Sequence, residues 1–404
     1  MANNKQINKD LLGVGHFIAS PTAKRYVGKV LESGRLSYGP FIKSFEERFS
    51  SSHGCMFGLM VNSGTSALRI AVACLKEVHA WKEGNEVLVP AITFVATANI
   101  VVDQGLKPVF VDVDSKTYNI DPEKIEACIT KKTRAIIVAH LFGQPADMRP
   151  IMKLARKHKL KVVEDSCETM FTEYRNKSVG SFGDIGCFST YVAHLIVTGV
   201  GGVAITNNKR YARIMRSLAN HGRNNIYISI DDDKGVDKDS FRKVIANRFN
   251  FIRPGYSFRV TEMEGALGCA QLDEVESTFP KRVKNAQYLI DKLQVIKDFI
   301  QLPYYPSHIG HAFMIFPVVL QKKYGNKRAL VNYLEERGIE TRDMMPLINQ
   351  PYYRKTYNIK KGQFPVADWI NLSGFYIGCH HYMRNHELDY IIDTFINYFS
   401  KKQV

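Results

Sequence analysis

The chain has 404 residues, a formal net charge of +16 and an ordinary globular composition, with 45% hydrophobic and 23% charged residues. This length is enough for one large domain and a smaller one. No apolar run reaches the roughly 18 residues that a membrane-spanning helix needs, and residues 1–10 lack the apolar core of a signal peptide. We therefore expect a cytoplasmic protein that does not enter a membrane.

The excess of positive charge does not by itself predict nucleic-acid binding. The basic residues are spread along the chain, and no aromatic-interleaved basic motif accompanies them. A positive field instead favours an anionic small substrate. The seven cysteines include no Cys-x-x-Cys pair, which is typical of reduced thiols and not of disulfides or metal clusters. The adjacent His380 and His381 point apart in most backbones, so we predict no metal site.

Apolar strands alternate with amphipathic helices through the first half of the chain. This pattern predicts an α/β fold with a mostly parallel sheet covered on both faces. Two helices around a turn at residues 36–40 precede it. The predicted helices are 22–33, 41–52, 62–77, 94–104, 122–129 and 148–158, and the predicted strands are 57–61, 86–89, 109–112, 135–141 and 161–164.

The second half begins with a strand from residue 183, a polar turn, a glycine-rich loop and a second strand that ends near residue 206. A polar surface excursion is predicted over residues 220–240, and a long helix over 262–294 with a break near Pro280. We place a domain boundary near residue 275, which gives a large domain (1–275) and a smaller α/β domain (276–404). Further predicted elements are helices 209–219, 328–337 and 386–399 and strand 314–320.

Polar clusters fall at the carboxyl ends of several predicted strands, where parallel sheets bind their ligands. One of them, Asn62-Ser63-Gly64-Thr65, opens a helix and could hold phosphate on free N–H groups, or could be a plain helix cap. The turn that carries His194 is open to two interpretations as well. It is either the rim of a bound cofactor or a tight connection with a buried histidine.

Seven short motifs occur in a fixed order along the chain. They are Asn-Ser-Gly-Thr-Ser-Ala (62–67), Pro-Ala-Ile-Thr-Phe-Val-Ala-Thr (90–97), His-Leu-Phe-Gly-Gln-Pro-Ala-Asp-Met (140–148), Glu-Asp-Ser-Cys-Glu (164–168), Gly-Ser-Phe-Gly-Asp-Ile-Gly-Cys-Phe-Ser (180–189), Thr-Gly-Val-Gly-Gly (198–202) and Gly-Tyr-Ser-Phe-Arg-Val-Thr-Glu-Met-Glu-Gly-Ala-Leu-Gly (255–268). Together they resemble the DegT/StrS family of nucleotide-sugar aminotransferases, which are pyridoxal-phosphate enzymes of fold type I. The resemblance covers about residues 33 to 395.

The resemblance implies a cofactor site. In it, Asp165 would face the pyridine nitrogen of the cofactor and Phe94 would stack on its ring. Gly64, Thr65 and Ser189 would hold the phosphate group. Without the resemblance, Asp165 also fits a helix cap and Phe94 also fits plain core packing.

Other residues take their expected roles from the same resemblance. Glu168 falls where the aminotransferases usually carry a glutamine near the ring oxygen. Ser257 falls where many relatives supply an asparagine across a homodimer interface. Tyr38 lies in a turn like the substrate-facing entry loop. Arg342 could bind an anionic sugar nucleotide, although a surface ion pair suits it equally.

His194 departs from the family pattern, because the aminotransferases carry their Schiff-base lysine at this position, five residues after Ser189. An imidazole cannot form that covalent link, but it can accept a proton. The exchange resembles the nucleotide-ketosugar 3-dehydratase branch. That branch implies non-covalently held pyridoxamine phosphate, proton removal by His194 and loss of the 3-hydroxyl of a 4-keto-6-deoxyhexose.

Residues 220–240 contain no cysteine, so we expect the cluster-free version of this enzyme, with glutamate as amino donor. Leu195 and Val200 depart from the family pattern and leave the substrate open. Two alternatives remain: an aminotransferase-like protein that uses His194 in place of lysine, and a non-catalytic partner that binds cofactor or sugar nucleotide.

Overall fold

The computed structural model describes residues 11–224, 235–247 and 249–400. The sequence-based expectations for residues 1–10 and for residues 225–234 of the polar excursion lie outside these ranges.

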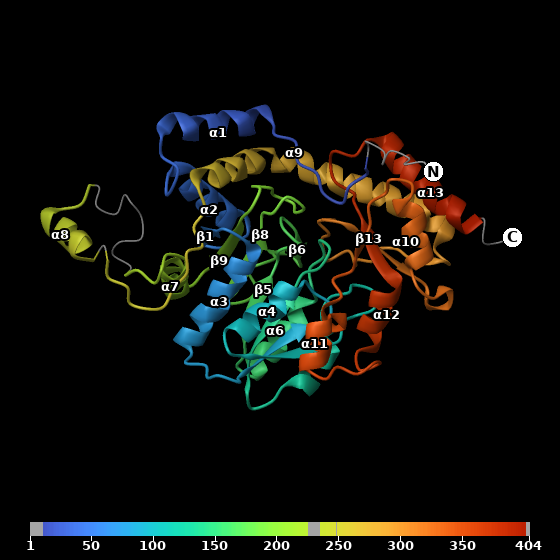
Figure 1. Cartoon of the computed structure of the whole chain (residues 1–404), viewed down its shortest axis with the longest axis horizontal. Helices are drawn as coiled ribbons and strands as arrows, with labels where there is room; N and C mark the ends of the chain where they lie inside the picture. The colour runs from blue at the N-terminus through green and yellow to red at the C-terminus, as the bar shows by residue number, and fades with distance from the viewer. Residues whose placement is uncertain (1–10, 225–234, 248, 401–404) are drawn as a thin grey trace, which may run out of the picture.

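Seven strands form the larger sheet, in the order β1-β9-β8-β5-β4-β2-β3 (Figure 1). The pairs β8/β5, β5/β4, β4/β2 and β2/β3 are parallel, whereas β9 runs antiparallel to both β1 and β8. The expected α/β fold with a large, mostly parallel sheet is therefore confirmed. The strands are β1 (Phe57–Val61), β2 (Glu86–Pro90), β3 (Lys107–Val111), β4 (Thr133–Ala139), β5 (Lys161–Asp165), β8 (Ile185–Ser189) and β9 (Gly202–Thr206).

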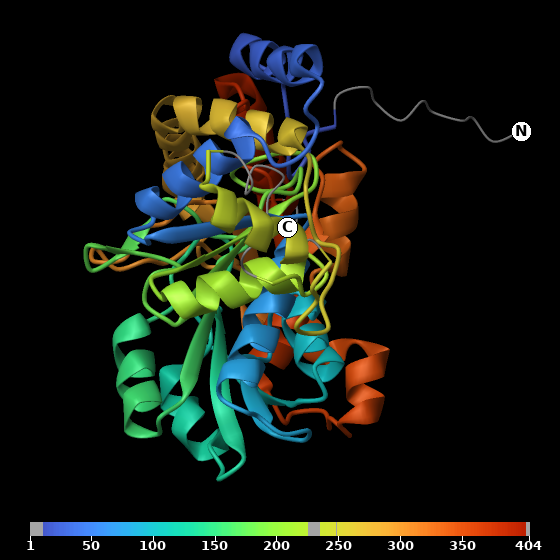
Figure 2. The same ribbon diagram turned by 90° about the vertical axis from the view of Figure 1, so that its left-hand side faces the viewer.

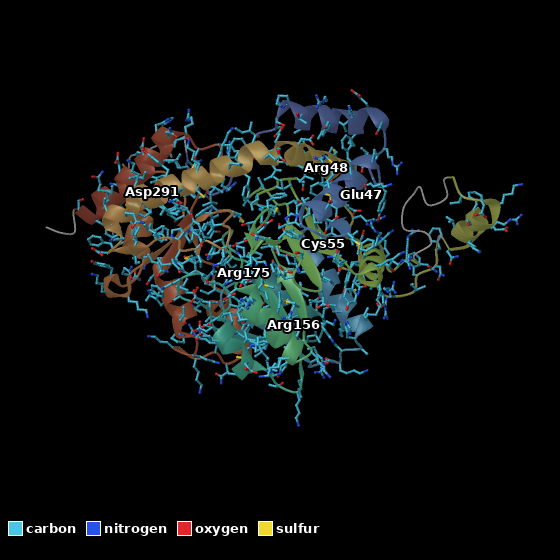
Figure 3. All side chains as sticks on the ribbon, turned by 180° about the vertical axis from the view of Figure 1, so that it is seen from behind. Glu47, Arg48, Cys55, Arg156, Arg175 and Asp291 are labelled. Carbon is cyan, nitrogen blue, oxygen red and sulfur yellow. The ribbon has the colours of Figure 1, made fainter. Side chains whose placement is uncertain are left out.

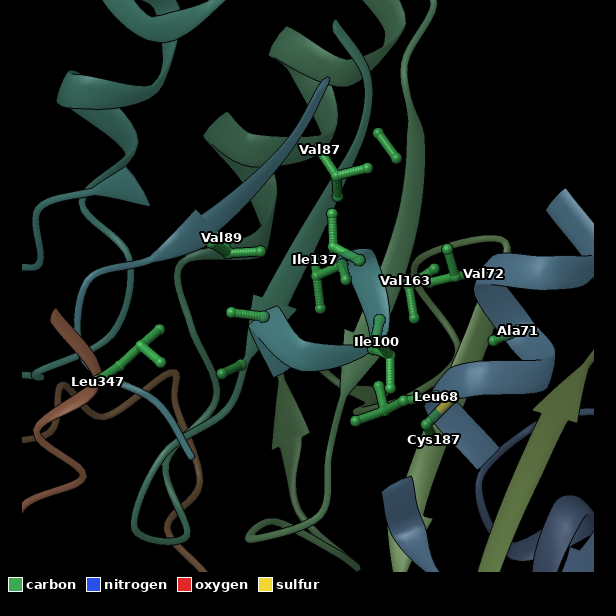
Figure 4. Packing of buried hydrophobic residues seen from close by; sticks show 14 of the residues in the cluster. Leu68, Ala71, Val72, Val87, Val89, Ile100, Ile137, Val163, Cys187 and Leu347 are labelled. Carbon is green, nitrogen blue, oxygen red and sulfur yellow. The ribbon is translucent and has the colours of Figure 1, made fainter. Parts of the chain in front are cut away.

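Helices cover both faces of this sheet (Figure 2). Val87, Val89 and Ile137 pack in one buried cluster with residues of α3 and α4 (Figure 4). Leu88 and Val138, from the same strands, pack in a second cluster with residues of α6. Successive side chains of a strand point to opposite faces, so strands buried on both faces are apolar throughout. The helices are α3 (Gly64–Val78), α4 (Val95–Asp103), α5 (Pro122–Ile125), α6 (Met148–Lys157) and α7 (Lys209–Ala219).

A smaller antiparallel sheet follows, in the order β10-β11-β13-β12. Its core joins Phe375 of β13 to Leu334 of α10 and Phe395 of α13. The sequence predicted β11, α10 and α13 but not the strands β10, β12 and β13 or the helices α11 and α12. The elements are β10 (Ile300–Gln301), β11 (Phe316–Leu320), β12 (Arg342–Asp343), β13 (Gly374–Ile377), α10 (Arg328–Glu335), α11 (Pro351–Thr356), α12 (Pro365–Ser373) and α13 (Asn385–Ser400).

Helix α9 (Glu262–Leu293) runs without interruption through the upper part of the molecule in Figure 1 and contains Pro280 in its interior. The predicted break near Pro280 is therefore wrong. An interior proline costs about 3 kcal/mol, but α9 contacts α1 (Pro21–Ser33), α2 (Pro40–Ser52) and α13. Burial of Ala266, Ala286 and Leu289 on either side of Pro280 holds the helix together. Residue 275 lies inside α9, and the division into two domains stays a prediction.

Helix α8 (Lys238–Asn247) stands apart from the two sheets in Figure 1, and Figure 3 shows its side chains clear of them as well. A short hairpin, β6 (Glu173–Tyr174) and β7 (Lys177–Ser178), completes the strands of the described ranges. Within those ranges, no helix combines the length and the apolar character that crossing a membrane would require.

Candidate active site

A cavity of about 420 Å³ lies at the carboxyl ends of β4, β5 and β8. The start of α3, the residues before α4 and the loop after β8 supply its other walls, and three residues of the C-terminal part close it. The predicted residues that line this cavity are Gly64, Thr65, Phe94, Asp165, Glu168, Ser189 and His194. The structure thus brings seven residues from distant motifs to one place.

The start of α3 has the form of a phosphate site. Ser63 caps the helix by accepting a hydrogen bond from the N–H of Ser66 (3.0 Å), and the first N–H groups of a helix have no partner inside it. A Cβ on Gly64 would lie 2.7 Å from Sγ of Cys167 and 2.8 Å from Cβ of Ser189. These contacts explain why glycine is needed here. Gly64 and Thr65 line the cavity at the start of the helix, where free N–H groups suit an anion.

Asp165 ends strand β5 with both carboxylate oxygens engaged. Oδ2 accepts a hydrogen bond from the Thr97 hydroxyl (2.7 Å), and that hydroxyl also contacts Thr93 Oγ1 (2.8 Å). Oδ1 accepts a longer one from the N–H of Cys167 (3.3 Å). Asp165 is thus a carboxylate held in one orientation, as an acceptor for a ligand N–H must be.

Glu168 is buried in the same wall, and its Oε2 accepts a hydrogen bond from the N–H of Phe142 (2.8 Å). Burial raises its pKa to about 7, against the lowering effect of that hydrogen bond. Near neutral pH this carboxyl therefore exchanges a proton, and it can donate as well as accept a hydrogen bond.

His194 lies in the loop between β8 and β9. The loop is closed by Thr190, whose N–H donates to the carbonyl oxygen of Gly201 (2.9 Å) and whose carbonyl oxygen accepts from the N–H of Thr198 (2.8 Å). Nδ1 of His194 is buried and has no hydrogen-bond partner among the described residues. Burial lowers the His194 pKa to about 4, so the imidazole is neutral at pH 7 and one ring nitrogen can accept a proton.

Three predicted residues do not line this cavity. The exposed Ser257 accepts a hydrogen bond from Nη2 of Arg259 (3.3 Å). Tyr38 lies in a turn whose following N–H groups donate to the buried Glu262. Arg342 is paired with Glu340, as the ion-pair interpretation expects. Their roles stay predictions.

The cavity also contains residues to which the sequence analysis gave no role. Cys167 stands between Asp165 and Glu168, while Met314, Met345 and Tyr376 approach from the C-terminal part. Thr97 acts on the site through Asp165. The four-residue spacing of Thr93 and Thr97 at a helix start was a signal for this pair, but no local pattern marks Tyr376.

These residues fit pyridoxal phosphate. The start of α3 offers backbone N–H groups to a phosphate, Asp165 offers an oriented carboxylate, and Phe94, with 58% of its surface exposed, offers a free ring face. His194 lines the same cavity as these groups, as a base for the reacting part of the cofactor must. Among the described residues, no group of three or more His, Cys, Asp or Glu side chains is placed to hold a metal ion.

Comparison with known proteins agrees with this arrangement. The model of the DegT/DnrJ/EryC1/StrS aminotransferase family matches residues 19–396. GDP-perosamine synthase of Caulobacter vibrioides is 31% identical over 88% of this chain and 89% of its own length. GDP-4-keto-6-deoxy-D-mannose 3-dehydratase of Escherichia coli O55:H7 is 30% identical over 90% of this chain and 94% of its own length.

A solved GDP-4-keto-6-deoxymannose-3-dehydratase superposes with a TM-score of 0.84 at 26% identity, over 94% of this chain and 99% of that one. It holds a trapped geminal diamine of pyridoxal phosphate and glutamate. These findings support the expected cofactor.

Proposed function

Because the chain belongs to the DegT/DnrJ/EryC1/StrS aminotransferase family, we propose that it is a pyridoxal-phosphate-dependent 3-dehydratase of a nucleotide-linked 4-keto-6-deoxyhexose. Overall identity does not select this activity, since a perosamine synthase and a 3-dehydratase are similar to the chain to the same degree. The observation that carries the proposal is the neutral His194 in the cavity wall, in which none of the lining residues is a lysine.

The protein's own residues have distinct tasks in this reaction. The N–H groups of Gly64 and Thr65, with Ser189, hold the cofactor phosphate. Asp165, oriented by Thr97, accepts the hydrogen bond of the protonated pyridine nitrogen. When bound in its amine form, the cofactor supplies an amine for the sugar ketone and a ring that accepts electrons.

His194 moves the proton. As a general base, its neutral ring would take a proton from the carbon next to the cofactor amine. The cofactor ring would supply the electron flow that lets the 3-hydroxyl leave as water once His194 holds that proton. Glutamate supplies the two electrons of the net reaction and leaves as 2-oxoglutarate, with release of ammonium. Histidine in place of lysine keeps the cofactor non-covalently bound.

The experiment combines the full-length protein, pyridoxal phosphate, glutamate and GDP-4-keto-6-deoxy-D-mannose, with mass determination of the sugar product. We expect a sugar that has lost the 3-hydroxyl, with one 2-oxoglutarate per turnover. The variant His194→Asn should bind cofactor with near wild-type affinity and form no product. An amino sugar that keeps its 3-hydroxyl would instead identify an aminotransferase. Cofactor binding with no turnover of either glutamate or the ketosugar would identify a binding protein.

We also propose that the enzyme is a homodimer, in which Ser257 of one subunit reaches the cofactor phosphate of the other. The support is that Ser257 lies outside the cavity of its own chain and is exposed on the surface. Sedimentation equilibrium should give twice the chain mass. A monomer with full activity would contradict the proposal.

A further inference from the structure

We propose that Tyr376 is the residue that contacts the sugar. Its hydroxyl would donate a hydrogen bond to a sugar oxygen, while Arg342 on the neighbouring strand binds the diphosphate. This inference rests on the proposed function and adds to it the direction in which the substrate lies. The sugar is held between the cofactor wall and β13, and the nucleotide points outward across the smaller sheet.

The hydroxyl of Tyr376, which is half-buried at the cavity, differs from those of the fully buried Tyr118 and Tyr174. Tyr376 lines the cavity from β13, and its hydroxyl makes no hydrogen bond to any residue of the described ranges. By contrast, the hydroxyl of Tyr118 accepts one from Gln301 (2.9 Å) and that of Tyr174 donates one to Asp147 (2.5 Å). Buried tyrosine hydroxyls usually have a partner within the protein. The half-buried Tyr376 instead lines the cavity with a donor that no described residue uses, and this donor is available to a ligand.

The surroundings keep this phenol in its donating form. Burial raises the Tyr376 pKa, and the nearby Glu168 carboxylate raises it further. A phenol that keeps its proton at all physiological pH values donates a hydrogen bond to a sugar hydroxyl or carbonyl oxygen. The ring of Tyr376 lies 6.1 Å from that of Phe142, whose N–H is bonded to Glu168. Tyr376 thus faces the cofactor wall at Glu168.

Strand pairing places Arg342 beside this donor. Arg342 and Tyr376 are directly opposite each other in the antiparallel pair β12/β13, and opposite residues send their side chains to the same face of a sheet, with Cβ atoms about 5 Å apart. The Arg342 side chain is 54% exposed and is paired through Nη2 with Glu340, while its Nη1 donates to the carbonyl oxygen of Thr341 (2.9 Å). A guanidinium next to the sugar donor, and nearer to solvent, suits the diphosphate.

The test separates the hydroxyl of Tyr376 from its ring. Tyr376→Phe keeps the packing against Phe142 and removes only the donor. Tyr305→Phe is the matched control, since the Tyr305 hydroxyl donates to Gln287 (2.8 Å) away from the cavity. In the His194→Asn background, where the sugar is not consumed, calorimetric titration with GDP-4-keto-6-deoxy-D-mannose measures the dissociation constant. In the active enzyme, the reaction of the cofactor with glutamate, followed by absorbance, measures a step without sugar.

We expect Tyr376→Phe to weaken sugar-nucleotide binding or to lower kcat/KM for the sugar by about 10-fold or more, with the glutamate step unchanged. Arg342→Gln should raise KM by a similar factor with little change in kcat, and Tyr305→Phe should change nothing. Unchanged sugar binding and turnover in Tyr376→Phe would overturn the inference, as would an equal loss in the glutamate step. If the wild type transfers its amino group instead, the proposed function fails. If Tyr376→Phe then lowers the rate of amino transfer to the sugar by about 10-fold and leaves the glutamate step unchanged, the sugar contact is still supported.

Discussion

The hydroxyl of Thr97 offers a quantitative test of how the site is held. Thr97→Val is nearly isosteric and removes the donor that lies 2.7 Å from Oδ2 of Asp165. Both side chains are buried, and a hydrogen bond to a charged group contributes about 1.5–3 kcal/mol. We expect the free energy of unfolding of the cofactor-free protein to fall by about this amount. Affinity for pyridoxal phosphate should fall about 10-fold, because the carboxylate loses its fixed orientation.

Thr169→Val is the matched control. Thr169 is equally buried, and its hydroxyl donates at the same distance (2.7 Å) to the neutral carbonyl oxygen of His140. A hydrogen bond between neutral groups contributes only about 0.5–1.5 kcal/mol, and this one does not touch Asp165. Urea unfolding and fluorescence titration with pyridoxal phosphate measure both quantities. If the two variants lose equal stability and bind the cofactor equally, the reasoning about Asp165 is refuted.

Three further variants test other parts of the structure. Burial lowers the pKa of His53 from 6.5 to about 4, so protonation favours the unfolded chain. Stability is complete above pH 6.5 and falls toward pH 4, and His53→Gln should reduce the loss between pH 7 and pH 5 by about 2 kcal/mol in urea unfolding. Gly64→Ala should destabilise the protein by about 1–3 kcal/mol and weaken cofactor binding, because its Cβ would lie 2.7 Å from Sγ of Cys167. Gly28→Ala, with nothing within 4 Å of its Cβ, is the control, and equal effects would count against the phosphate site. Glu168→Gln should abolish a spectral titration of the bound cofactor near pH 7, and persistence of that titration would assign it to another group.

Elements with strong local patterns were predicted well. The strand Phe57–Val61 and the helix Lys209–Ala219 occur with the predicted bounds, because each carries its own periodicity. Strand β12 covers only Arg342–Asp343 and pairs with β13. Two residues are too few to show the alternating pattern that predicts a strand. The uninterrupted α9 was missed because neighbouring helices outweigh the local cost of Pro280.

The residues of the candidate site also differ in whether the sequence could identify them. Gly64, Asp165 and His194 stand in motifs and could be named from the sequence, and the cavity contains all three. Thr97 lies in a quoted motif, but its task depends on a carboxylate 68 positions away. Tyr376 could not be found, since it reaches the cavity only when β13 is placed against the elements of the larger sheet.

The sequence by itself determined the alternation of strands and helices in the first half of the chain, the mostly parallel sheet, and the histidine in place of a lysine after Ser189. These features rest on the spacing of neighbouring residues, which does not depend on how the chain packs. Only the tertiary structure decided that His194 is neutral, that Glu168 titrates near pH 7, and that Tyr376 has a free hydroxyl at the cavity. Those properties depend on how much water is excluded and which groups meet across long stretches of chain, and packing alone sets both.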